Sequence, residues 1–257
     1  MCLLAFDWQP GAPVPLRLIA NRDELHARPT APLHRWTPAS GPDVTLLGGR
    51  DKQAGGTWLA ANAFGTVAAL TNMRDPREES PAGAPSRGEL VCQALACRDL
   101  PAWLDALAAT AHRYAGFNLL VATPERLWHL HRSRERTALR RVAAGIHGVS
   151  NADLDTPWPK TQALCRAMEE ARQGGDFPGP ALAAIQNDRR ADDAALPDTG
   201  VAPEVERALS AAFIRGETYG TRATTWLTLG RHGRVTMTEQ RFGAGGVLAG
   251  STAGAIG

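Results

Sequence analysis

The 257-residue chain lacks the features that define several classes of protein. Its four cysteines show no C-x-x-C spacing, which argues against a zinc ribbon or a disulfide scaffold and fits free thiols in a reducing compartment. No run approaches the roughly 18 apolar residues of a membrane span. The chain also begins without the basic segment and long apolar stretch of a signal peptide. We therefore expect a cytoplasmic protein without a transmembrane segment.

The chain also lacks an excess of charge of one sign. It carries 28 basic and 26 acidic residues, for a net charge of +2, so nucleic acid is not an expected partner. A hydrophobic content of 44% is sufficient for one large domain, which we place at residues 1–242. Residues 243–257 are almost wholly Gly, Ala, Ser and Thr, and this composition predicts a disordered tail.

The apolar pattern changes its period several times along the chain. Runs typical of strands and stretches with helical spacing alternate in blocks, which predicts an α+β protein. Between the first strands and the first helices, residues 73–87 form a long polar loop of a kind that is often functional. The expected strands cover residues 2–8, 16–21, 58–63, 66–71, 117–122, 127–131, 145–150, 225–229 and 234–238, and the expected helices cover 89–97, 102–111, 160–172, 181–187 and 205–214.

Cys2 is the first candidate for chemistry. If Met1 is removed, this residue presents a thiol and a free α-amine on one carbon, with reference pKa values of about 8.5 and about 7.7–8.0. Such a residue can attack a carbonyl and use its own amine as the base. The alternative is an ordinary buried thiol in a strand.

A charged pair follows the second expected strand, whose partner begins at Cys2. Asp23 could hold the Cys2 ammonium through its carboxylate, and Arg22 could direct its guanidinium toward a substrate. The alternative for this pair is a solvated charged turn.

Three further polar residues lie where expected strands begin or end. Asn72 and Asn151 each follow a strand, and a side-chain amide there can stabilise an oxyanion, although asparagine is also common in turns. Arg222 begins a late strand, where it could bind an anionic part of a ligand or steady the nucleophile.

Taken together, these groups and their neighbours form an ordered set of short motifs. They are Met1-Cys2, Asn21-Arg22-Asp23-Glu24, Gly55-Gly56-Thr57-Trp58-Leu59, Thr71-Asn72 with Arg74, Ser86-Arg87-Gly88 with Leu90, Gly116-Phe117-Asn118-Leu119, Gly148 with Ser150-Asn151, Pro157-Trp158-Pro159-Lys160 and Tyr219-Gly220-Thr221-Arg222. The set resembles the N-terminal-nucleophile hydrolases of the penicillin V acylase and bile salt hydrolase type. More specifically, it resembles the NRDE family of transport and Golgi organization proteins, from Cys2 to about Phe242.

This resemblance implies a four-layer αββα sandwich of two stacked antiparallel sheets. It also implies a possible N-terminal-cysteine amidohydrolase that cleaves a non-peptide C–N amide bond and requires no cofactor. In this mechanism Asn151, with help from Asn72, stabilises the oxyanion, Asp23 orients the amine, and Arg22 and Arg222 supply positive charge. In the acylases the matching Arg and Asp are separated by other residues, whereas in this chain they are adjacent.

The resemblance leaves open an alternative function of a different class. A non-catalytic protein could use the same pocket to bind and traffic haem, acyl-CoA or another lipid. His129 and His131 are two residues apart on an expected strand and would therefore lie on one face, where either could ligate haem iron, as could the Cys2 thiolate. The expected ligand is thus a small amide, an acyl compound or haem.

Overall fold

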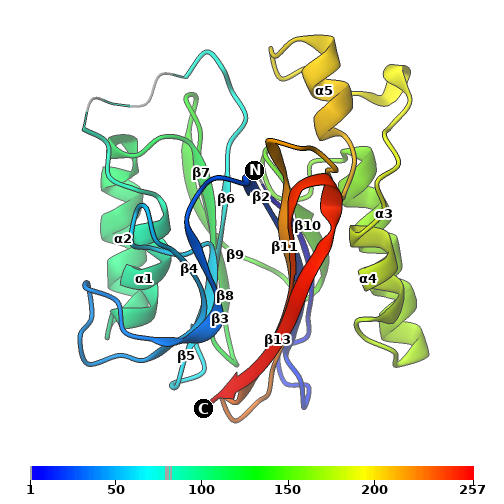
Figure 1. Ribbon diagram of the computed structural model, residues 1–257. Helices are drawn as coiled ribbons and strands as arrows, with labels where there is room; N and C mark the ends of the chain where they lie inside the picture. The colour runs from blue at the N-terminus through cyan, green and yellow to red at the C-terminus, as the bar shows by residue number, and fades with distance from the viewer. Residues whose placement is uncertain (1, 79–80, 82) are drawn as a thin grey trace.

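A computed structural model describes residues 2–78, 81 and 83–257, with the backbone only at Cys2. Two antiparallel sheets are stacked face to face, with helices on the outer face of each (Figure 1). The expected four-layer αββα sandwich is confirmed by this arrangement.

The first sheet holds both ends of the described chain. Its strand order is β10-β1-β2-β11-β12-β13, and β1 and β2 form the N-terminal hairpin. The strands are β1 (Cys2–Trp8), β2 (Leu16–Leu25), β10 (Gly145–Val149), β11 (Tyr219–Leu229), β12 (Val235–Phe242) and β13 (Leu248–Ile256).

The second sheet is built from the middle of the chain in simple sequence order, β3 to β9. Its strands are β3 (Thr30–Trp36), β4 (Leu46–Asp51), β5 (Leu59–Asn62), β6 (Val67–Asn72), β7 (Phe117–Ala122), β8 (Leu127–Arg132) and β9 (Thr137–Arg141).

The helices form the two outer layers. α1 (Gly88–Ala96) and α2 (Leu100–Thr110) pack on the second sheet, and α3 (Pro159–Gly174) and α4 (Gly179–Ile185) pack on the first. α5 (Pro203–Leu209) follows them and ends five residues before the expected boundary at Ile214. Short 3₁₀ turns occur at Ala111–Arg113, Asp193–Ala195 and Ala244–Gly246.

The apolar run at the start of β1 is explained by burial on both of its faces. Successive strand side chains point to opposite faces, so Leu4 and Phe6 enter the core between the sheets. Leu3 and Ala5 pack instead against Leu164 and other residues of the α3 and α4 layer. The run from Leu3 to Phe6 is therefore apolar at every position, which differs from the alternation of a strand with one solvated face.

The prediction of a disordered tail is wrong for most of residues 243–257. β13 pairs with β12 in antiparallel register, and Ile256 lies in the core between the sheets. Its small residues suit this edge, because a Cβ on Gly254 would approach Leu47 of β4 to 3.1 Å. Low side-chain volume therefore permits close packing of the two sheets at this point, rather than signalling disorder.

Candidate active site

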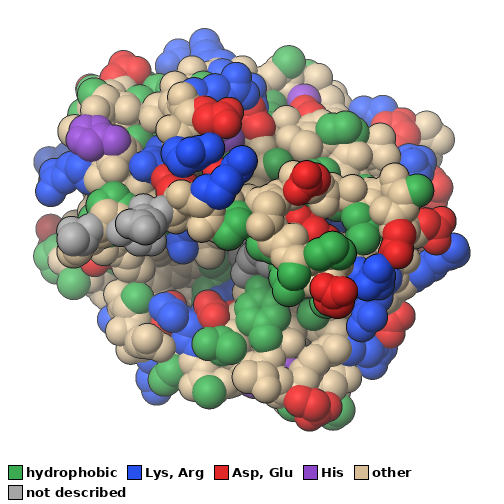
Figure 2. Space-filling view, turned by 90° about the horizontal axis from the view of Figure 1, so that it is seen from above, with side chains coloured by type: hydrophobic (Ala, Val, Ile, Leu, Met, Phe, Trp, Pro, Cys, Tyr) green, Lys and Arg blue, Asp and Glu red, His purple; other side chains and the backbone are tan. Residues whose placement is uncertain are grey.

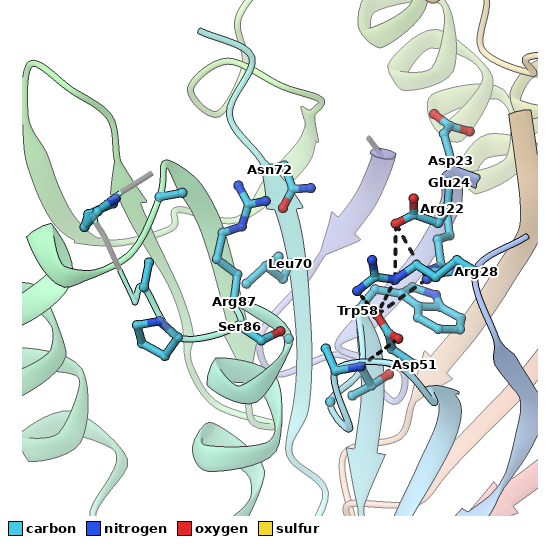
Figure 3. A pocket seen from close by; sticks show the side chains of 18 of the residues that line it. Arg22, Asp23, Glu24, Arg28, Asp51, Trp58, Leu70, Asn72, Ser86 and Arg87 are labelled. Carbon is cyan, nitrogen blue, oxygen red and sulfur yellow. Dashed lines mark hydrogen bonds and ion pairs between the residues drawn. The ribbon is translucent and has the colours of Figure 1, made fainter. Parts of the chain in front are cut away.

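A cavity of about 500 Å³ opens where β2 ends near the start of β1. Figure 3 shows Arg22 and Asp23 on one side of it and Asn72 on the other. The view in Figure 2 shows a hollowed end of the molecule bordered by hydrophobic, basic and acidic side chains. The lining comprises Arg22, Asp23, Glu24, Arg28, Asp51, Ala54, Gly56, Thr57, Trp58, Leu70, Asn72, Pro81, Gly83, Ala84, Pro85, Ser86, Arg87, Gly88 and Ala115.

Cys2 and Arg22 face each other across the first hairpin. β1 and β2 pair in a register that sets Cys2 opposite Arg22, so the first strand residue lies beside the cavity wall. The side chain of Cys2 itself lies outside the described part of the structure. The apolar pattern of the hairpin specifies this register, because a shift of one residue would turn every core side chain to the wrong face.

Arg22 is buried and held by contacts on the side of the second sheet. Its guanidinium lies 4.3 Å from the centre of the Trp58 ring and donates a 3.2 Å hydrogen bond to Thr30 Oγ1. It also lies 3.8 Å from carboxylate oxygens of Glu24 and Asp51. The Arg22-Asp23 pair therefore belongs to a buried strand and is not a solvated turn.

Asp23 is buried on the opposite face of β2. Its Oδ1 accepts a 2.7 Å hydrogen bond from Thr221 Oγ1 of β11. Burial raises the pKa of the Asp23 carboxyl, and the positive charges of Lys160 and Arg74 and the hydrogen bond from Thr221 partly offset that rise. A buried carboxylate surrounded by cationic groups is suited to holding an ammonium group beside it.

Asn21 is a structural member of the same motif. Its amide nitrogen donates to the carbonyl oxygens of Ile185 and Ala212, at 2.8 Å each, and its oxygen accepts from Thr224 Oγ1 at 2.6 Å. These bonds fasten β2 to the end of α4, to β11 and to residues 210–214, which follow α5 and lie outside the helix. The expected helix does not continue here because the backbone N–H groups of Phe213 and Ile214 bond to the Asn187 carbonyl and to Thr221 Oγ1 rather than to carbonyls four residues earlier.

Asn72 and Asn151 meet, although they come from different sheets. Asn151 Nδ2 donates a 2.8 Å hydrogen bond to the backbone oxygen of Asn72. Asn151 is buried, whereas Asn72 lines the cavity. Asn151 is not among the described residues that line the cavity, so the two asparagines have different positions relative to it.

Arg222 is not among the described residues that line the cavity. Its guanidinium donates to the backbone oxygens of Leu25 and Arg28 and, at 3.2 Å, to Thr30 Oγ1. Because Arg22 bonds the same hydroxyl, Arg222 holds the turn that supports Arg22. A β-bulge between Thr221 and Ala223 produces this orientation.

A buried ion pair close to the site was not among the expected site residues. Arg74 donates to Glu206 at 2.6 Å, stacks over the Trp158 ring at 5.0 Å and donates its backbone N–H to the carbonyl of Asn151. Lys160 is also buried and donates to the carbonyl of Leu209 at 2.8 Å. Arg74 and Lys160 occur in the motifs quoted above, which was the available signal, whereas Glu206 occurs in none of them.

Both ring nitrogens of His129, one of the residues considered for haem ligation in the alternative function, have hydrogen-bond partners. His129 and His131 do share a face, as predicted, but both are buried and both bond to Asn118 Oδ1. The second ring nitrogen of His129 accepts a 3.2 Å hydrogen bond from Arg140 Nε. Both nitrogens are thus already engaged, and a metal would have to displace one of these bonds.

The residues that the structure describes contain neither a metal-binding cluster nor a membrane-spanning helix. Within that part of the chain, no group of three or more His, Cys, Asp and Glu side chains is placed to hold a metal ion. No helix formed by these residues has the length and apolarity required to cross a membrane.

The stacked αββα layers define a fold of the N-terminal-nucleophile-hydrolase type. The family model described as Transport and Golgi organisation 2 matches residues 1–244, and the chain belongs to this family. It is 34% identical over 271 residues to the Transport and Golgi organization protein 2 homolog of Bos taurus, covering 93% of this chain and 92% of the relative. The homolog of Homo sapiens is 32% identical over 267 residues, with the same coverage.

A solved structure supports the fold assignment independently. A variant of conjugated bile acid hydrolase from Clostridium perfringens aligns with a TM-score of 0.54, covering 100% of this chain and 92% of that chain. The sequence identity is 9%, so this likeness concerns the fold.

Proposed function

We propose that this protein is an N-terminal-cysteine amidohydrolase that cleaves the C–N bond of a small non-peptide amide. The observation that carries the proposal is the pairing of Cys2 with Arg22 at the rim of a cavity. Asp23 adjoins this pair, and Asn72 lies on the opposite wall. A nucleophile, a carboxylate and a neutral amide donor would thus surround one ligand-sized space.

The proposed reaction proceeds in two halves. Removal of Met1 frees the Cys2 amine, which takes the thiol proton, and the thiolate attacks the amide carbonyl. The tetrahedral oxyanion collapses, the C–N bond breaks, and the ammonium gives its proton to the leaving amine. Water then attacks the thioester with the same amine as base, which releases a carboxylic acid and restores the thiol.

In this mechanism the two asparagines take different roles from those expected from the sequence. Asn72 is the oxyanion donor because it lines the cavity, and Asn151 supports it by bonding to its backbone carbonyl. Asp23 orients the ammonium, and the buried Arg22 guanidinium favours the thiolate. Arg222 acts on Arg22 through Thr30 rather than on the substrate.

The cavity favours a ligand with an apolar part and a polar part. Its volume of about 500 Å³ is typical of a small-molecule site. Trp58 and Leu70 offer apolar surface, while Arg28 and Arg87 bring positive charge to the same walls.

The proposal is tested with a probe that does not depend on the natural substrate. Intact mass first establishes whether Met1 is removed, and p-nitrophenyl acetate is then used to acylate the protein. We expect a burst of nitrophenolate and an acetyl group mapped to Cys2. Cys2→Ala should abolish the burst, whereas the control Cys97→Ala should preserve it. A burst that survives Cys2→Ala, or acylation confined to other residues, would refute the proposal.

A further inference from the structure

We infer that Asn118 is a positioning residue that fixes the two strand-end asparagines, Asn72 and Asn151, relative to each other. The role of Asn72 in this inference rests on the proposed function, whereas the link between the two segments does not. Asn118 lies in β7, is 1% exposed and is absent from the described lining of the cavity, so it acts through other residues.

The amide of Asn118 connects the two segments directly. Its Nδ2 donates to Thr71 Oγ1 at 3.1 Å and to the carbonyl oxygen of Ala152 at 2.8 Å. Thr71 immediately precedes Asn72, and Ala152 immediately follows Asn151. One side chain therefore holds the neighbours of both asparagines, at the point where Asn151 also bonds to the Asn72 carbonyl.

The orientation of this amide is fixed by His129 and His131. Asn118 Oδ1 accepts from His129 Nε2 at 3.0 Å and from His131 Nδ1 at 2.9 Å. Since Arg140 Nε donates to His129 Nδ1, the proton of the neutral His129 ring must lie on Nε2. A flipped amide would oppose its NH₂ group to the His129 N–H donor and its oxygen to the Ala152 carbonyl, so these contacts select a single orientation.

The network closes on the loop that carries Asn151. Arg140 pairs with Asp153, which Arg136 also contacts, and Asp153 follows Ala152 directly. Asn118, His129, Arg140, Asp153 and Ala152 thus form a closed ring of contacts between β7, β8, β9 and this loop. Residues 150–155 have no helix or strand of their own, so their position depends on such contacts.

The inference is tested with a pair of matched substitutions. Asn118→Asp keeps the acceptor but removes the donor to Thr71 and Ala152. Asn62→Asp is the control, because Asn62 is also a buried strand asparagine but bonds to Leu95, Phe64 and Thr66. Hydrogen exchange of the peptides covering 70–73 and 150–153 is measured together with the rate of Cys2 acylation by p-nitrophenyl acetate.

We expect Asn118→Asp to raise exchange about tenfold in both peptides together and to slow acylation about 100-fold, the loss associated with a misplacement of about 1 Å. Asn62→Asp should change neither readout. If only one peptide responds, or if Asn118→Asp acylates as fast as Asn62→Asp, the inference is wrong.

A second pair of variants keeps the test decisive if Asn118→Asp does not fold. His129→Gln retains a donor for Asn118, whereas His129→Leu removes it. We expect His129→Gln to stay within about threefold of wild type in acylation and His129→Leu to lose at least tenfold. Equal losses in the two would contradict the positioning role. If wild type itself is not acylated at Cys2, the proposed function fails, and the exchange measurements still test the link.

Discussion

Gly49 of β4 offers a sharp test of how the cavity wall is built. A Cβ added at this position would lie 2.4 Å from Trp58 Cη2, 2.6 Å from Trp58 Cζ2 and 3.0 Å from Glu239 Oε2. The Arg22 guanidinium lies over the Trp58 ring, 4.3 Å from its centre. The absence of a side chain on Gly49 therefore allows the ring, and with it Arg22, to occupy their positions.

Gly49→Ala should force the Trp58 ring to move. Overpacking a well-packed site costs roughly 1–3 kcal/mol of stability, and loss of the stacked guanidinium adds about 0.5–1 kcal/mol. We expect the free energy of unfolding in urea to fall by about 1.5–4 kcal/mol. Gly174→Ala is the control, since a Cβ there meets no atom within 4 Å, and a gain of up to about 1 kcal/mol is expected in its helix.

The assay that isolates the cause is a double-mutant cycle with Trp58→Ala. When the ring is absent, Gly49→Ala should cost less than about 0.5 kcal/mol, which gives a coupling of at least about 1 kcal/mol between the two sites. If Gly49→Ala lowers the free energy of unfolding equally with and without the Trp58 ring, the clash with Trp58 does not cause its effect. The conclusion that Gly49 makes room for Trp58 would then be wrong.

Three further predictions concern protonation and charge. Burial, aided by the positive charge of Arg140, lowers the pKa of His129 to about 3, so the unfolded chain binds a proton below pH 6.5 that the folded chain does not. Stability should therefore fall by up to about 1.4 kcal/mol per pH unit as pH drops from 6.5 toward 3, and His129→Gln should reduce this slope in urea titrations at pH 6.5, 5.5 and 4.5. Iodoacetamide at pH 7.5 should label Cys2 before Cys92 in peptide mapping, because burial raises the pKa of Cys92 to about 11; comparable rates would contradict this. Glu206→Leu should cost about 3–5 kcal/mol in urea unfolding by leaving Arg74 buried without its carboxylate, and adding Arg74→Met should recover most of that loss.

The sequence predicted the central strands because their apolar pattern reflects burial that any register must satisfy. β1 and β6 lie within one or two residues of the expected ranges. β3, β4, β9 and β13 were missed. Pro32, the paired glycines of β4 and the small residues of β13 lower strand propensity, and β9 is a short edge strand without a fully buried residue, so it has no apolar pattern. Their pairing depends on close contact with neighbouring elements, such as a Cβ on Gly48 meeting the Leu59 carbonyl at 2.6 Å, and no local pattern encodes that contact.

The candidate site was predictable where its residues follow a strand and hidden where they meet across the fold. Asn72 was found because it ends a strand, and the structure places it on the cavity wall. Glu206 pairs with Arg74 across 132 positions of sequence, and Asn118 binds two histidines of the next strand inside the protein. A single sequence does not indicate which buried polar side chains will become partners, because that depends on how the layers stack.

The adjacency of Arg22 and Asp23, which departs from the spacing in the acylases, follows from the geometry of a strand. Neighbouring side chains of β2 point to opposite faces, so Arg22 turns toward Trp58 and the second sheet, while Asp23 turns toward Lys160 and the α3 layer. Both still line the cavity, because it lies at the end of the strand, where both faces are accessible. Insertion of one residue between them would place both on the same face and remove either the guanidinium or the carboxylate from its present partners. The adjacent pair is therefore suited to this site, in which opposite charges approach one strand end from two layers.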